Sequence, residues 1–180
     1  MEKSKAERVR YFKELMGEAF SSVQCECMVD QLDAMGFFEA PASAGHHGAY
    51  PGGLFDHSAE VTEQLLWLTR HLELKWGKLK SPYIVGMFHD LCKVNQYEQK
   101  EDGSFMYRAA AILPGHGDKS VILAQRILEL TTEEILCIRW HMGAYEGKEV
   151  WNDLGAAIRE CPNVLYAHTA DMLATHVVGI

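Results

Sequence analysis

Apolar residues recur at helical spacing along most of this chain, and this periodicity constrains the fold more than any other feature. Within residues 54–72, for example, Val61, Leu65, Leu66 and Leu68 fall on one face of a helix. The same spacing predicts helices over residues 5–20, 21–35, 54–72, 81–90, 118–130, 132–141, 151–160 and 162–176. A chain built this way is expected to be an all-α helical bundle.

Residues 95–110 depart from helical spacing. The segment 101–104 reads Glu-Asp-Gly-Ser, which has the composition of a tight turn. Tyr97 precedes this turn and the apolar run 105–107 follows it, so we expect a small β-hairpin with Asp102 and Gly103 at its tip. The predicted fold class is therefore an all-α bundle with one small β-hairpin.

Length and composition favour one domain. The chain has 180 residues, of which 48% are hydrophobic, enough to build a single core without stapling. Nothing marks a split, so residues 1–40 are expected to supply N-terminal helices and residues 41–178 the core of the same domain. No apolar run approaches the roughly 20 residues that span a bilayer, and residues 1–10 lack the apolar stretch of a secretory signal.

The cysteines and the net charge limit the cellular setting and the partners. Five cysteines without framework spacing favour reduced thiols, and the expected location is the cytoplasm. A formal net charge of −8 disfavours long nucleic acid, because duplex binding depends on many contacts from Lys and Arg to phosphates. A small phosphorylated ligand held by metal ions remains compatible with this charge. The oligomeric state is not predicted.

Histidines and aspartates recur at or beside predicted helix ends. The candidates are His57, His89, Asp90, His116, His141 and Asp171. Imidazole and carboxylate together suit divalent metals, and side chains from different helices of a bundle can converge on one ion. Asp171 falls within an otherwise apolar helix, where a carboxylate is costly without a cation or a hydrogen-bond partner.

The order of these residues resembles that of the HD superfamily of metal-dependent phosphohydrolases. Residues 88–93, Phe-His-Asp-Leu-Cys-Lys, match its HD-leucine-x-lysine signature, with Cys92 where glycine is common. Residues 52–58 match the usual surroundings of the first histidine, and residues 46–54 are similar to the lead-in of bacterial HD proteins and HD-domain exoribonucleases. The resemblance covers roughly residues 41–176.

The resemblance implies the metal ligands. His57, His89, Asp90 and Asp171 would hold one divalent ion, and Asp90 would bridge to a second. His116 and His141 resemble the additional ligands of subfamilies that bind two metals. The expected cofactor is thus one or two divalent ions, drawn from Mn, Fe, Ni, Zn and Mg. These ions would activate a hydroxide for in-line attack on phosphorus.

Three further residues are candidates for contact with the substrate. Lys93, about one helical turn beyond His89, would offer a charge to a phosphate oxygen, which makes it a catalytic candidate together with Asp90. Alternatively, it merely ends a helix favourably. His168 lies three residues before Asp171 on the same helical face, and either contacts substrate or makes a supporting hydrogen bond. His47 either lines the pocket or lies in a solvated loop.

The leading functional prediction is a hydrolase that cleaves a phosphate ester, with a nucleotide as the expected substrate. One alternative is a 3′-5′ exoribonuclease or phosphodiesterase acting on short RNA. A second is a non-catalytic HD module that senses a nucleotide, and a third is an HD-fold di-iron oxygenase. Fold and ligands alone do not separate these functions.

Overall fold

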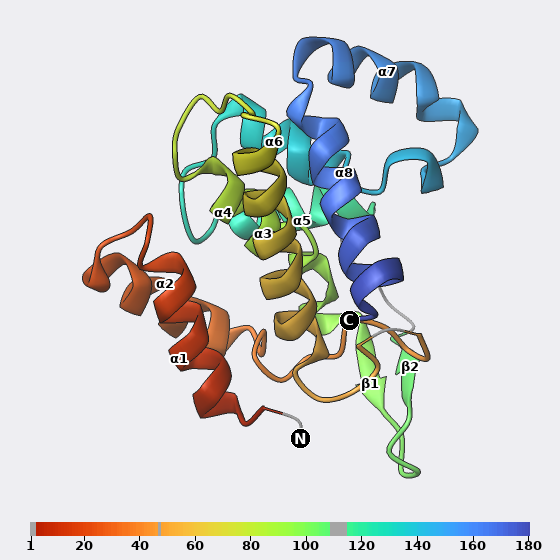
Figure 1. Cartoon of the computed structure of the whole chain (residues 1–180). Coiled ribbons are helices and arrows are strands. Elements are labelled where there is room, and N and C mark those ends of the chain that lie inside the picture. The colour runs from red at the N-terminus through yellow and green to blue at the C-terminus, as the bar shows by residue number, and fades with distance from the viewer. Residues whose placement is uncertain (1–2, 47, 109–114) are drawn as a thin grey trace.

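The computed structural model describes residues 3–46, 48–108 and 115–180 and confirms the all-α fold class (Figure 1). The α-helices are α1 (Lys5–Met16), α2 (Ser22–Ala34), α3 (Gly53–His71), α4 (Ser81–Phe88), α5 (His116–Ala124), α6 (Thr132–Arg139), α7 (Trp151–Glu160) and α8 (Asn163–Leu173). Short 3₁₀ segments are η1 (Leu91–Asn95), η2 (Gly143–Tyr145) and η3 (Lys148–Val150), and a π-helical turn, η4 (Ala174–Val178), follows α8.

The predicted β-hairpin is confirmed. Strands β1 (Tyr97–Gln99) and β2 (Phe105–Tyr107) pair antiparallel, with Tyr97 opposite Tyr107. Gly103 adopts a left-handed φ of 84°, a conformation that glycine reaches without steric cost, and Asp102 accepts a hydrogen bond from the backbone N–H of Ser104. The hairpin projects from the end of the bundle at which α3 begins (Figure 1).

Local capping explains where several helices begin. Ser21 caps α2 and Thr131 caps α6, each in a capping box with the residue three positions later. Pro82 lies in the first turn of α4, where its missing N–H costs nothing.

α3 is the central element of the core. It packs against α4 and α8, as Figure 1 shows, and buries Leu54 and Leu65 completely. Aromatic rings join the N-terminal helices to it, because Phe12 from α1 packs against Phe38, which packs against Phe55 of α3, with ring centroids 5.8 and 5.4 Å apart.

The predicted bounds of two helices were wrong. α1 ends at Met16 rather than near residue 20, and α5 spans His116–Ala124 rather than 118–130. His116 is the first residue of α5, two residues before the predicted start of this helix. Gly117 allows α5 to pack closely against Arg139, because a Cβ at this position would collide with the main-chain carbonyl of Arg139.

No helix within the described part of the chain combines the length and the apolar character that crossing a bilayer requires.

Candidate metal centre

The structure brings the predicted metal ligands together at one end of the bundle. His57 lies in the first turn of α3, His89 and Asp90 directly follow α4, and Asp171 lies near the end of α8. His116 opens α5, and His141 comes two residues after α6. Their ligand atoms form three overlapping groups, each with its atoms within 4.8 Å: His57, His89 and Asp171; His89, Asp90 and His141; Asp90, Cys92 and His116.

Asp90 lies at the centre of this cluster. Its Oδ1 is 2.6 Å from Nε2 of His116 and 3.5 Å from Nε2 of His141. Its Oδ2 is 3.5 Å from Nε2 of both His57 and His89. The two carboxylate oxygens therefore face different histidine pairs, which is the arrangement that a bridging carboxylate requires.

Main-chain carbonyls orient two of the imidazole rings. Nδ1 of His89 lies 2.7 Å from the carbonyl oxygen of Gly86, and Nδ1 of His141 lies 2.7 Å from that of Ile138. A carbonyl oxygen only accepts hydrogen bonds, so the N–H of each ring is at Nδ1 and donates to the carbonyl. In the neutral ring, Nε2 then directs a lone pair toward Asp90. Histidines that bind a metal through one ring nitrogen typically donate such a hydrogen bond from the other.

Two observations show that a cation fits this cluster. Nε2 of His141 is buried and has no hydrogen-bond partner among the described residues. Nε2 of His89 and Nε2 of His57 face each other at 3.3 Å. Buried polar atoms normally have partners, and imidazole nitrogens and carboxylate oxygens are ligands of borderline divalent metals.

His57 and Asp171 join α3 to α8 at this end. Nε2 of His57 lies 3.2 Å from Oδ1 of Asp171, and its Nδ1 lies 2.9 Å from the main-chain oxygen of Ile180. Burial opposes ionisation of Asp171, but the hydrogen bond from His57 and the other imidazoles nearby outweigh it and lower the pKa of this carboxyl. Asp171 is therefore an anion despite its apolar helix.

Lys93 forms a close ion pair with Asp90, with Nζ 2.6 Å from Oδ2, and is only 12% exposed. Burial alone would raise the pKa of Asp90, but Lys93, His89 and His116 outweigh it and hold this pKa well below its usual range. Burial also disfavours the charged form of Lys93, which lowers its pKa. The attraction of Asp90 raises this pKa by more, so the net shift is upward. Both side chains are charged, and Lys93 belongs to the cluster rather than to a solvated helix end.

Cys92 is a member of the cluster that the sequence analysis did not propose as a site residue. Its Sγ lies 3.2 Å from Nδ1 and 3.8 Å from Nε2 of His116, and burial raises the pKa of this thiol to about 12. The available signal was its position between Asp90 and Lys93, where the resembled motif commonly has glycine.

The two histidines predicted to contact substrate are placed differently. Nδ1 of His168 donates a hydrogen bond to the main-chain oxygen of His141 at 2.7 Å. This contact matches the supporting hydrogen bond that was weighed as an alternative. His47 lies outside the described residues.

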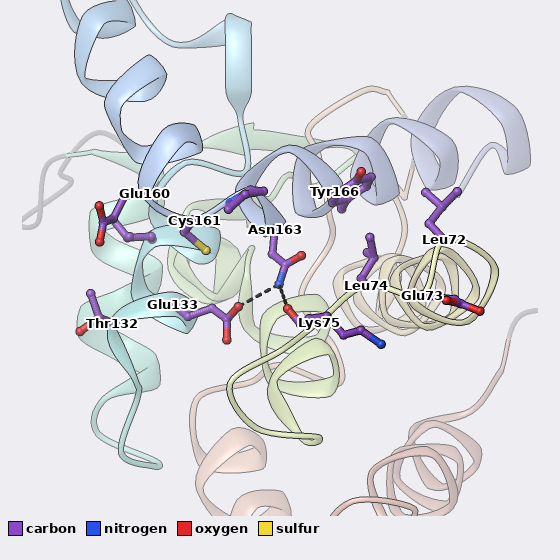
Figure 2. Close-up of a pocket in the computed structure, with 12 residues that line it drawn as sticks. Leu72, Glu73, Leu74, Lys75, Thr132, Glu133, Glu160, Cys161, Asn163 and Tyr166 are labelled. Carbon is purple, nitrogen blue, oxygen red and sulfur yellow. Dashed lines mark hydrogen bonds between the residues drawn. The ribbon is translucent and has the colours of Figure 1, made fainter.

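A separate cavity of about 610 Å³ lies at the opposite end of the same helices. Its lining includes Leu72 after the end of α3, Thr132 at the start of α6 and Asn163 at the start of α8 (Figure 2). At about 1.5 Å per residue, the length of α3 alone separates the two ends by roughly 20 Å. The amide of Asn163 donates to Glu133 and to the main-chain oxygen of Lys75, so this buried amide already has protein partners.

Fold and geometry together define a helical protein with buried histidine and aspartate groups that could hold metal ions. A stretch of 70 residues is 40% identical to part of dihydroneopterin 2′,3′-cyclic phosphate phosphodiesterase from Methanocaldococcus jannaschii. This stretch covers 37% of the chain and 28% of that protein. No protein-family model matches the chain, and no solved structure gives a significant match. The chain thus has partial similarity to a hydrolase of phosphate esters.

Proposed function

We propose that this protein is an HD-type metal-dependent phosphohydrolase that cleaves a small phosphate ester. The observation that carries the proposal is the position of Asp90, whose two oxygens face two histidine pairs in a buried cluster. The partial similarity to a cyclic phosphate phosphodiesterase supports the same reaction class.

The two sides of Asp90 define two places for an ion. His57, His89 and Asp171 would hold one ion with Asp90, and His116 and His141 would hold the other. Divalent ions bound there would supply positive charge for phosphate and lower the pKa of a bound water. The oriented histidines limit the reorganisation that binding needs, because their Nε2 atoms already point inward.

Lys93 has a distinct role in this proposal. It holds Asp90 ionised and fixes Oδ2 through its close contact. An ammonium group has three N–H donors, so the donors not used by Asp90 remain for a phosphate oxygen. Asp90 and Lys93 would then act together, one holding ions and the other orienting the phosphoryl group.

The proposed substrate is a small phosphorylated molecule, with nucleotides and 2′,3′-cyclic phosphodiesters as the first to test. The partial similarity to a 2′,3′-cyclic phosphate phosphodiesterase favours a cyclic phosphodiester. The net charge of −8 disfavours a long RNA substrate, since exonuclease grooves attract the backbone with basic side chains.

The experiment that tests this function begins with protein stripped of metal by chelation. The protein is reloaded with Mn, Fe, Ni, Zn or Mg singly and assayed against 2′,3′-cyclic nucleotides, nucleoside monophosphates and short RNA. We expect metal-dependent hydrolysis of a small ester, retained in the surface control His71→Ala. Shortening of RNA alone would favour the exoribonuclease, and iron-dependent oxygen consumption the oxygenase. Metal binding with no reaction at all would favour the sensing module.

A second experiment counts the ions. His116→Ala removes a ligand from one side of Asp90 only. We expect it to lose one metal equivalent and most activity, while the ion beside His57, His89 and Asp171 remains. A wild-type protein that binds one ion under saturating Mn or Fe would contradict the two-ion arrangement.

A further inference from the structure

Two residues of α5, His116 and Ser120, contact Cys92. Ser120, one turn beyond His116 on the same helix face, accepts a hydrogen bond from the backbone N–H of Cys92 at 3.0 Å. This contact fixes the main chain at residue 92, and the fully buried thiol lies directly against the ring of His116. The sulfur is thus held in the metal cluster by the packing of α5.

The distances around this sulfur are those of atoms that can share an ion. In a tetrahedral site with metal–sulfur and metal–nitrogen bonds of about 2.3 and 2.0–2.1 Å, the two ligand atoms are roughly 3.6 Å apart. Sγ of Cys92 lies 3.8 Å from Nε2 of His116, and both belong to a group with Asp90 whose ligand atoms are within 4.8 Å.

A second, independent observation points to a ligand at the same place. The partnerless Nε2 of His141 is 3.5 Å from Oδ1 of Asp90, the same oxygen that lies 2.6 Å from His116. Oδ1 of Asp90 therefore lies near Nε2 of both His116 and His141, and the sulfur of Cys92 lies beside His116. Sulfur is a soft ligand that favours zinc and similar ions, whereas Mg and Mn prefer oxygen.

We propose that Cys92 is a thiolate ligand of the ion beside His116, and that this half of the centre therefore selects zinc or a similar borderline ion over Mg. As the metal–sulfur bond forms, the S–H bond breaks and the proton passes to the buffer. The inference deepens the proposed function, because it assumes that this side of Asp90 holds an ion.

Cobalt(II) is the probe for this ligand, because a thiolate bound to it gives a charge-transfer absorption in the near ultraviolet. We expect the band when wild-type protein binds two Co equivalents, and its loss in Cys92→Ser with the first equivalent still bound. The affinity for the second Zn equivalent should fall at least roughly tenfold, since even the loss of a residue that hydrogen-bonds to a metal ligand lowers metal affinity by that factor. Cys25→Ser, which removes another buried thiol, should keep the band.

X-ray absorption of the zinc-loaded wild-type protein gives a test that needs no variant. We expect sulfur scattering at about 2.3 Å from zinc. Two bound cobalt equivalents without the band, or a band that persists in Cys92→Ser, would overturn the inference and leave the proposed function standing. The band without hydrolysis of any ester would overturn only the function, and failure to bind cobalt would overturn both.

Discussion

The two ends of the bundle use the same helices for opposite purposes. At the cavity end, the amide of Asn163 donates to Glu133 and to the main-chain oxygen of Lys75, and the other oxygen of Glu133 accepts from the backbone N–H of Gly77. At the metal-centre end, by contrast, Nε2 of His89 faces another imidazole nitrogen rather than a carbonyl. Both ends carry polar side chains drawn from α3, α6 and α8 or the turns beside them.

This difference separates polar groups that stabilise a fold from those that need an outside partner. Where buried donors meet acceptors, the hydrogen bonds add modest stability to the fold. Such groups have few donors or acceptors left to bind a ligand. Where imidazole lone pairs and carboxylates converge, the arrangement is favourable only with a cation between them. The cavity beside Asn163 is therefore not the place where we expect chemistry.

The largest effect should come from Asp90→Ala, which removes the group between the two histidine pairs. Loss of an outer partner of a metal ligand costs roughly 10–100-fold in affinity or activity, and loss of a shared ligand should cost more. We expect turnover to fall below detection and metal content to drop sharply by elemental analysis. Circular dichroism should show an intact fold, and full metal content in this variant would remove Asp90 from the centre.

Lys93→Met should have the next largest effect, because it removes one charge and keeps most of the apolar stem. Loss of a charge-assisted contact of about 1.5–3 kcal/mol slows kcat/KM by roughly one to two powers of ten. Metal content should stay unchanged. The metal-free protein should have a lower melting temperature, because Asp90 loses the ammonium group of Lys93.

Lys119→Met is the matched control for that variant. Lys119 is similarly buried, but its Nζ donates to the neutral amide of Asn95 at 2.6 Å rather than to a carboxylate. If the two variants slow kcat/KM equally, the charge on Lys93 has no special role in the reaction.

The sequence predicts which histidines and aspartates come together better than it predicts the contacts around them. His89, Asp90 and Lys93 form a local signature. Helix periodicity places His57, His89 and Asp90 at helix ends and Asp171 within a helix. The role of Cys92 beside His116 depends on how α5 packs, which no local pattern encodes. The start of α5 at His116 was also missed, since the close packing of Gly117 against Arg139 belongs to the tertiary structure.

The pH dependence of stability should show whether Asp90 is ionised in the metal-free fold. The pKa values of Asp90 and Asp171 are lowered in the folded protein, so their contribution is fully present above the unfolded value of about 3.9. It is lost as pH falls through the lower folded pKa values. Urea unfolding of metal-free protein should therefore show a steeper loss of stability below about pH 4 in wild type than in Asp90→Asn. Equal slopes would show that Asp90 is not ionised in the metal-free fold.

The smallest effect on activity should come from the cavity end, where Asn163→Ala tests whether that end is purely structural. The change deletes both hydrogen bonds of the amide and leaves a carboxylate oxygen of Glu133 and the main-chain oxygen of Lys75 without this partner. Leaving such groups unsatisfied costs about 1–3 kcal/mol, reduced here because water can enter the open cavity. We expect a lower melting temperature with kcat/KM and metal content unchanged. A fall in kcat/KM at full metal content, measured well below the melting temperature, would mean that the two ends are coupled through α8.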